Sequence, residues 1–267
     1  MSQLTTSTAY TGEARYDSPR VVETPMVTYV VKRDAPGLVA GKIQDVDVVL
    51  DLGPGICPQP FLTPYVHICV DAHRPYLERL KRESADDPKY VLINAPWDQV
   101  IGMFPDKSVD TVFALDFIEH LEKPDGLRML REAARVARHQ IVVYTPHGFF
   151  PQSYDDPRKA DRWGMDGGYW QTHRSGWAPE DFGEEWDCVI CPDWIELNQD
   201  NQPMDRPMGA LWAFRTFDPA AQRRYYVTKD PSVWVHVKGL LELGLPRGVF
   251  VRLRSAWGFL LRTTGRA

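Results

Sequence analysis

Residues 46–55 read VDVVLDLGPG and set the architecture of the whole chain. This run is nearly all apolar and ends in an acid and two glycines, which is typical of a strand buried on both faces of a parallel sheet. Glycines directly after such a strand let the backbone turn sharply and approach a ligand closely. A dinucleotide fingerprint needs a third glycine, but Gly55 is followed by Ile, Cys and Pro, so the sequence disfavours NAD.

The same strand pattern recurs downstream. Further strands are predicted over 66–72, 89–95, 108–116, 140–146, 186–197 and 209–217, the last two joined by a polar turn region. Helices are predicted over 74–84 and 124–139, the second with one apolar stripe of Leu127, Leu130, Ala134 and Ala137. Strands that alternate with helices at this spacing indicate βαβ units and a doubly wound, mostly parallel α/β fold.

The chain divides into three predicted parts. Residues 1–40 form an N-terminal segment, which we interpret as a lid, with a short helix or strand at 20–33. Residues 41–218 form the sheet domain, with an aromatic and glycine-rich insertion at about 147–176. An insertion longer than about 15 residues favours a functional role. Residues 219–267 form a basic C-terminal appendage.

Composition excludes several classes of protein. With 267 residues, 43% of them hydrophobic and 25% charged, the chain has an ordinary globular balance. The net charge is −5, but residues 237–267 carry +5, which leaves −10 for the body. A body this acidic argues against a nucleic-acid partner, whose binding surface is positive. Four cysteines and an N-terminus without an apolar signal segment predict a cytoplasmic protein.

Cys188 and Cys191 have the spacing of half a zinc knuckle. No second pair exists, and residues three apart on a strand face opposite sides. We therefore predict that both cysteines belong to the core.

Polar residues end the first four predicted strands of the domain. Asp51 and Asp71 close the first two, Asn94 closes the third, and Asp116 closes the fourth. An acid at the end of the second strand can accept hydrogen bonds from a ribose diol. Because parallel strands present their carboxyl ends at one edge, we expect these side chains to meet there.

Taken together, these motifs resemble those of the class I S-adenosylmethionine (SAM)-dependent methyltransferases over about residues 46–217. DLGPG is similar to the family's first motif, VDAHRPYLERL to the second-strand motif, and residues 104–146 to its fourth strand, fourth helix and fifth strand. The resemblance implies a seven-stranded sheet whose last strand is antiparallel. It also implies SAM contacts from Asp51, Gly53 and Gly55 at the methionine end, Asp71 at the ribose, Asn94 and Ala95 at the adenine edge, and Asp116 at the amino-acid end.

The chain departs from the family pattern after Gly55. Only ten residues separate Gly55 from Val66, and three of them are prolines, so the usual first helix is predicted to shrink to about one turn. A short segment of this kind resembles methyltransferases of glycan and polysaccharide pathways.

Methyl transfer to a hydroxyl requires alignment of the acceptor and removal of its proton. The candidate catalytic residues are His120, His147 and His173, because each lies where a class I sheet opens its carboxyl edge. In addition, Asp116, Glu119, His120 and His173 resemble the divalent-metal site of small-RNA 2′-O-methyltransferases and ubiquinone-pathway O-methyltransferases. That resemblance implies Mg²⁺ or another divalent ion. The alternative is that Glu119 and His120 only shape the loop and cap a helix, as in metal-free relatives.

The aromatic residues of the insertion and the basic C-terminal stretch each allow two interpretations. The aromatic residues of the insertion, among them Trp163, Tyr169, Trp170 and Trp177, either form a platform for a sugar or aromatic ring or simply pack a long loop. The basic, amphipathic stretch 247–262 either lies on an anionic membrane at the inner face or docks on protein.

The predicted function is O-methylation of a sugar hydroxyl on a glycan or polysaccharide precursor. One alternative is a methyltransferase that acts on the O or N atom of a small natural product. An alternative from another class is a non-catalytic SAM-binding scaffold.

Overall fold

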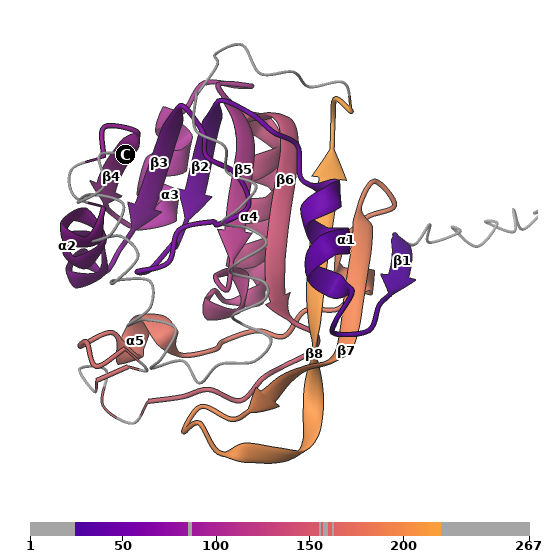
Figure 1. Cartoon of the computed structure of the whole chain (residues 1–267). Coiled ribbons are helices and arrows are strands. Elements are labelled where there is room, and N and C mark those ends of the chain that lie inside the picture. Colours follow the sequence, from indigo (N-terminus) through magenta and orange to yellow (C-terminus); the bar gives the residue numbers. More distant parts are fainter. Residues whose placement is uncertain (1–24, 85–86, 155, 157–159, 162, 220–267) are drawn as a thin grey trace, which may run out of the picture.

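The structure is a computed structural model that describes residues 25–84, 87–154, 156, 160–161 and 163–219. One eight-stranded sheet forms its centre, in the order β1-β7-β8-β6-β5-β2-β3-β4 (Figure 1). The strands are β1 (Met26–Tyr29), β2 (Val48–Leu52), β3 (Val66–Asp71), β4 (Tyr90–Asn94), β5 (Val109–Leu115), β6 (Ala137–Pro146), β7 (Asp187–Leu197) and β8 (Pro203–Thr216). The helices are α1 (Ala35–Lys42), α2 (Arg74–Glu83), α3 (Trp97–Val100), η1 (Ile101–Met103), η2 (Ile118–His120), α4 (Lys123–Val136), α5 (Gly168–Gln171) and η3 (Pro179–Asp181).

The α/β fold class predicted from the sequence is confirmed. Strands β2 to β6 pair in parallel, and β8 runs antiparallel between β6 and β7. The sheet has eight strands, however, and not the seven that the family resemblance implied. The extra strand is β1, which pairs in parallel with β7 from Met26 opposite Asp187 to Tyr29 opposite Ile190.

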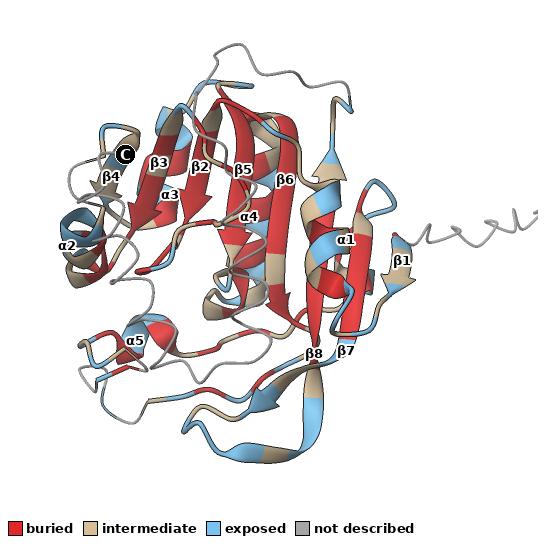
Figure 2. Ribbon diagram, in the orientation of Figure 1, coloured by how far each residue is buried: buried red, intermediate tan, exposed pale blue. Residues whose placement is uncertain are grey.

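The central strands are buried on both faces of the sheet. Successive side chains point to opposite faces, and a core cluster covers each face. On one face, Ala35 and Val39 of α1 share a core cluster with Phe113 of β5. On the other face, Met129 of α4 shares a cluster with Val112. Figure 2 shows β2, β3, β5 and β6 as almost wholly buried. This explains their near-continuous apolar sequences.

Helix α4 ends three residues earlier than predicted, because Ala137 opens β6 opposite Val109. The predicted apolar stripe of α4 is confirmed at Leu130, which is buried, and at Ala134, which is partly buried against the core, but it was wrong at its two ends. Leu127 is exposed and Ala137 belongs to the strand, whereas the buried residues of the helix are Gly126, Met129, Leu130, Ala133 and Val136. The sequence carries apolar residues on two overlapping arcs of this helix, and only packing against the sheet selects one.

Strand β8 begins at Pro203, six residues before the predicted start. Its first part pairs with the end of β7 in a hairpin that extends beyond the parallel strands (Figure 1). Pro203 and Pro207 lower the strand propensity there, which explains why the sequence predicted a turn. Cys188 and Cys191 are buried in clusters on opposite faces of the sheet, as predicted.

The N-terminal and C-terminal predictions have different outcomes. The predicted boundary between residues 40 and 41 falls within α1, which the sequence analysis did not predict, and β1 before it is part of the sheet. The basic stretch 247–262 lies outside the described residues. Across the described part of the chain, no helix combines the length and apolarity needed to cross a membrane.

Candidate active site

The carboxyl ends of β2, β3, β4 and β5 meet at one edge of the sheet (Figure 1). The loop after β2 contains Gly53 and Gly55, with φ values of +63° and +56°. These left-handed conformations favour glycine because a Cβ is strained there. A Cβ on Gly53 would also lie 2.1 Å from Cδ2 of Phe117, in the loop after β5. The two loops are therefore in direct contact.

Asp71 connects the loops after β2 and β3. Its Oδ2 accepts a hydrogen bond from the Gly55 amide at 3.0 Å, and its Oδ1 accepts one from the His73 amide at 2.7 Å. Burial raises the pKa of the Asp71 carboxyl to about 6, although the two amide bonds oppose that rise. A carboxylate offers about four lone pairs, so two stay open for a ligand.

The end of β4 is fastened to the end of β3. The Asn94 side-chain amide donates to the backbone oxygens of Asp71 at 2.9 Å and Ala72 at 3.0 Å. The Ala95 amide donates to the Asp71 oxygen at 3.1 Å. Asn94 and Ala95 thus lie beside Asp71, and their contact with an adenine edge stays a prediction.

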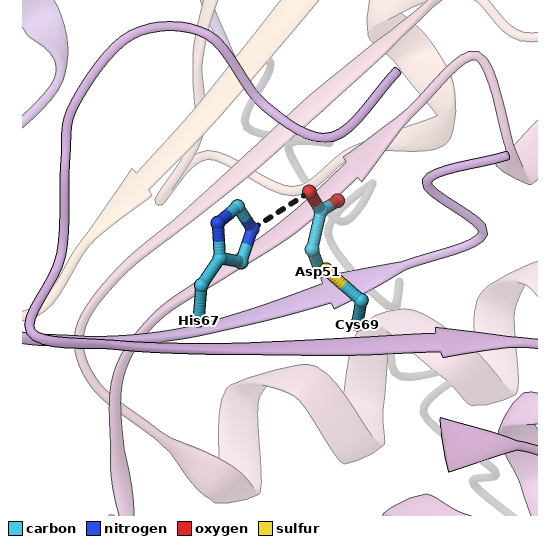
Figure 3. A group of neighbouring side chains, drawn as sticks. All are labelled: Asp51, His67 and Cys69. Carbon is cyan, nitrogen blue, oxygen red and sulfur yellow. Dashed lines mark hydrogen bonds and ion pairs between the residues drawn. The ribbon is translucent and has the colours of Figure 1, made fainter. Parts of the chain in front are cut away.

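Asp51 at the end of β2 makes contacts within the protein. Its carboxylate projects onto the sheet face beneath residues 53–65, where Oδ2 meets His67 Nε2 at 3.1 Å and accepts from the Gln59 amide at 2.8 Å (Figure 3). The family's first helix was predicted to shrink to about one turn; the segment contains no helix, and a turn closed by the Cys57 amide and the Pro54 oxygen stands in its place. Asp51 therefore holds the loop in place, and its contact with the methionine end stays a prediction.

Asp51, His67 and Cys69 also bring three metal-ligand atoms within 4.8 Å of one another. Asp51 and His67 already bind protein partners, and burial raises the pKa of the Cys69 thiol far above its usual value. These contacts and the raised thiol pKa give the cluster a packing role in the sheet.

A second polar cluster lies after β5 and unites three of the predicted residues. One ligand atom each from Glu119, His120 and His173 lie within 4.8 Å of one another, and the two imidazole rings are 4.8 Å apart. Asp116, the fourth predicted ligand, is exposed, is not in this group, and has a φ of +56°. A positive φ is uncommon outside glycine and marks a locally constrained turn.

Glu119 is buried in η2 and its pKa lies well above the usual range, first because of burial and then because of the Asp116 charge. Asp116 and Thr145 both influence this carboxyl. Within the described residues, however, neither oxygen of Glu119 makes a hydrogen bond of ordinary geometry. A buried acid in this state needs either a proton or a cation.

Backbone carbonyls orient the two imidazoles. Nδ1 of His173 lies 2.8 Å from the Phe150 oxygen, and Nδ1 of His120 lies 3.2 Å from the Thr172 oxygen. Because a carbonyl only accepts, the Nδ1 atom of each ring carries a proton. Burial, and then the neighbouring His173, lower the pKa of His120 to about 4. His120 is therefore neutral at pH 7.

The insertion is anchored to η2 by backbone contacts. The backbone amides of Arg174 and Ser175 both donate to the backbone oxygen of Glu119. The Arg174 guanidinium donates to the backbone oxygens of His120 and Thr172. The contacts to Glu119 and His120 join residues about 55 apart in sequence and hold His173 beside His120.

His147, the third catalytic candidate, does not join this cluster. It follows β6, where its amide donates to the Gly209 oxygen at 2.9 Å and its backbone bridges to Trp177. Trp177 is itself fully buried, which shows that this aromatic residue of the insertion belongs to the core.

Sequence reasoning missed His73, Tyr76 and Asp161. His73 follows Asp71 by two residues and is buried against the Tyr76 ring, whose hydroxyl donates to Asp161 of the insertion. The buried positions of α2 mark Tyr76 as a packing residue, but nothing local in the sequence signals its pairing with Asp161.

Comparison with known proteins finds a family model that matches the segment containing these strand ends. Residues 50–144 match the family model described as a methyltransferase domain. No curated protein matches the sequence.

Several solved structures are similar to the chain. The YcgJ protein of Bacillus subtilis is 15% identical, with a TM-score of 0.43 over 68% of this chain and 97% of its own. A SAM-dependent methyltransferase of Archaeoglobus fulgidus is 15% identical, with a TM-score of 0.42 over 69% and 91%. The SAH-bound N-terminal domain of EvdMO1 is 12% identical, with a TM-score of 0.45 over 69% and 80%. The match of residues 50–144 to the methyltransferase-domain model agrees with the enzyme class that the sequence predicted.

Proposed function

We propose that the protein transfers a methyl group from SAM to a hydroxyl acceptor. The observation that carries this proposal is Asp71, a buried carboxylate that is aligned by the Gly55 amide and keeps lone pairs for a ribose diol. Gly53 and Gly55 beside it leave the backbone bare of Cβ atoms where the methionine moiety would approach. SAM supplies an activated methyl group on a sulfonium.

For the acceptor we propose a sugar hydroxyl on a glycan or polysaccharide precursor. A hydroxyl must lose its proton as the methyl group arrives, and the neutral imidazole of His120, with the ring of His173 beside it, is suited to receive that proton. Two aromatic residues of the insertion, Tyr169 and Trp170, are substantially exposed and meet edge-to-face. Exposed aromatic rings suit stacking against the apolar face of a sugar.

As the alternative to a histidine base, we propose a divalent metal ion at Glu119, His120 and His173, because an imidazole nitrogen that ligates a metal cannot also accept a proton. The donor set fits, because it combines a buried carboxylate that lacks a well-formed hydrogen bond in the described structure with two imidazoles, and one ligand atom of each residue lies within 4.8 Å of the others. Asp116 lies near enough to affect the pKa of both Glu119 and His120, which suits it for an outer contact. Such an ion would acidify an acceptor hydroxyl.

The metal is tested by titrating chelated protein with Mn²⁺ or Mg²⁺ in a calorimeter. One site is expected in the wild type, and Glu119→Gln and His173→Ala should each weaken it. Chelation should abolish methyl transfer, and the ion should restore it. A chelated enzyme with full activity, or a titration without heat of binding, would remove the metal from the mechanism.

The activity is tested with SAM labelled on its methyl group and a panel of sugar, phenolic and amine acceptors. Label in a sugar ether supports the proposed acceptor, whereas label in a phenol ether or a methylamine supports a natural-product enzyme. SAM binding without turnover on any acceptor, together with no effect of His120→Ala and His173→Ala in cells, supports the non-catalytic scaffold. Failure to bind SAM at all contradicts the function itself.

We also propose peripheral membrane contact through residues 247–262. The support is the basic, amphipathic sequence, because Arg side chains flank an apolar arc that contains Trp257. Deletion of residues 237–267 should reduce co-sedimentation with anionic liposomes. An equal pellet fraction with and without the tail would exclude this contact.

A further inference from the structure

The insertion reaches back from the histidine cluster to the loops after β2 and β3. Asp161, which is buried, fastens this contact. Its Oδ2 accepts from the Tyr76 hydroxyl on α2, and its Oδ1 accepts from the amides of Trp163 at 2.8 Å and Met165 at 3.1 Å. One carboxylate therefore closes a turn of the insertion and anchors that turn to α2.

This turn carries the Trp163 ring to the glycine loop. The ring meets Tyr76 edge-on, with centroids 5.4 Å apart and planes at 87°. A Cβ built on Gly55 would lie 3.7 Å from Cη2 of Trp163, so the indole is a direct neighbour of the Gly55 backbone. Gly55 is also the residue whose amide donates to Asp71. Trp163 thus lies beside the group proposed to hold the ribose.

His73 adds an independent sign of a ligand at the same place. Its amide donates to Asp71, and its ring packs edge-on against Tyr76 at 4.4 Å. Its Nε2 is shielded from solvent and has no hydrogen-bond partner among the described residues. Buried polar atoms nearly always have a partner, so this nitrogen points to a polar ligand group that completes it.

We propose that Trp163 forms an aromatic wall of the nucleoside-binding site, with His73 Nε2 as a polar contact to the bound nucleoside. This inference rests on the proposed function and extends it, because it assigns part of the cofactor site to the insertion. One segment then carries Trp163 against the nucleoside and His173 against the acceptor. Tyr76 and Asp161 are positioning residues, since they act through Trp163.

The test is calorimetric titration of the full chain with S-adenosylhomocysteine (SAH). Trp163→Ala should weaken binding about tenfold, as expected for loss of one aromatic contact with the nucleoside, and Trp163→Phe should keep most of the affinity. Trp170→Ala is the matched control, because Trp170 belongs to the same insertion and is exposed, and it should bind like the wild type. Wild-type affinity in Trp163→Ala would overturn the proposal.

Two further measurements guard against a variant that merely misfolds. Tyr76→Phe removes only the hydroxyl that contacts Asp161, and it should weaken SAH binding in the wild-type background but not in the Trp163→Ala background. SAH should also change the tryptophan fluorescence of the wild type and of Trp170→Phe, and this change should be smaller in Trp163→Phe. Additive effects of Tyr76→Phe and Trp163→Ala would contradict the proposed role of Trp163. A fluorescence change on SAH binding that is as large in Trp163→Phe as in the wild type would also contradict it.

The outcomes separate this inference from the function on which it rests. If the wild type binds no SAH, the proposed function fails. If the wild type binds SAH and Trp163→Ala binds it equally well, only the aromatic wall fails.

Discussion

The two halves of the candidate site are held together in different ways. The cofactor half, at the ends of β2, β3 and β4, is fixed by hydrogen bonds between neighbouring strands and loops, such as Gly55 to Asp71 and Asn94 to the Asp71 backbone. The acceptor half depends on the insertion, which returns over about 50 residues to bring His173 beside His120. The first half follows from strand order, whereas the second depends on pairings between distant residues. If this contrast is right, substitutions in one half should leave the other half's task intact.

The largest effect is expected from His173→Ala. Loss of a general base lowers turnover by about 100- to 10,000-fold, and the affinity for SAH should change little because His173 belongs to the acceptor half. Turnover and calorimetric affinity are measured on the same preparation. His147→Ala is the comparison, because His147 lies outside the cluster and should have a far smaller effect. If His173→Ala also lost SAH binding, the proposed independence of the two halves would be contradicted.

Asp71→Ala should instead weaken cofactor binding, because Asp71 belongs to the cofactor half. Hydrogen bonds to a charged acceptor contribute about 1.5–3 kcal/mol each, so losing the ribose contacts and the Gly55 anchor should weaken SAH binding by about 100-fold. Asp87→Ala serves as the control, since its carboxylate pairs with Lys89 before β4. Unchanged affinity in Asp71→Ala, measured by calorimetry, would remove the ribose role.

Gly53→Ala tests the contact between the loops after β2 and β5. A Cβ 2.1 Å from the Phe117 ring, on a residue with a φ of +63°, forces the loops apart. Overpacking of this kind costs about 2 kcal/mol and should lower the thermal midpoint by several degrees. Gly37→Ala in α1 has no atom within 4 Å of its Cβ and should be neutral or slightly stabilising. Equal midpoints for the two variants would contradict the close packing.

The smallest expected effect is a pH dependence of cofactor affinity. Ribose hydroxyls bind the ionised form of Asp71, whose pKa is about 6, so SAH affinity should fall about tenfold per pH unit below pH 6. Stability should change in the opposite direction. The folded pKa exceeds the unfolded one, so the contribution of Asp71 to stability is present at low pH and is lost as pH rises from about 4 to 6. Asp71→Asn should abolish both slopes, and a flat affinity profile in the wild type would be inconsistent with an ionised ribose contact.

The sequence predicts the cofactor half well because its information is local. An apolar run such as 46–52 must be a buried strand, and the acids that end such strands must meet at one edge. Where two local patterns competed, prediction failed in part: α4 buries Met129 and Val136, which the predicted stripe did not contain, and β8 starts at Pro203 despite its prolines. Helix α1 escaped prediction because its short sequence contains Pro36 and two glycines.

The acceptor half shows what local patterns cannot supply. The sequence identified Glu119, His120 and His173 through a family resemblance, and the structure brings the three together without Asp116. The Asp51 side chain projects from the same face of the sheet as His67, because side chains alternate between the two faces along a strand. The partners of Trp163 and Trp177 depend on the path of the insertion, so their similar sequence contexts gave no sign that one lies by Gly55 and the other in the core.

The most direct measurement is a crystal structure of the protein grown with SAH. The account predicts the ribose hydroxyls within hydrogen-bond distance of the Asp71 carboxylate and the homocysteine moiety beside Gly53 and Gly55. Density for SAH that makes no contact with Asp71, or no density at a saturating concentration, would contradict it.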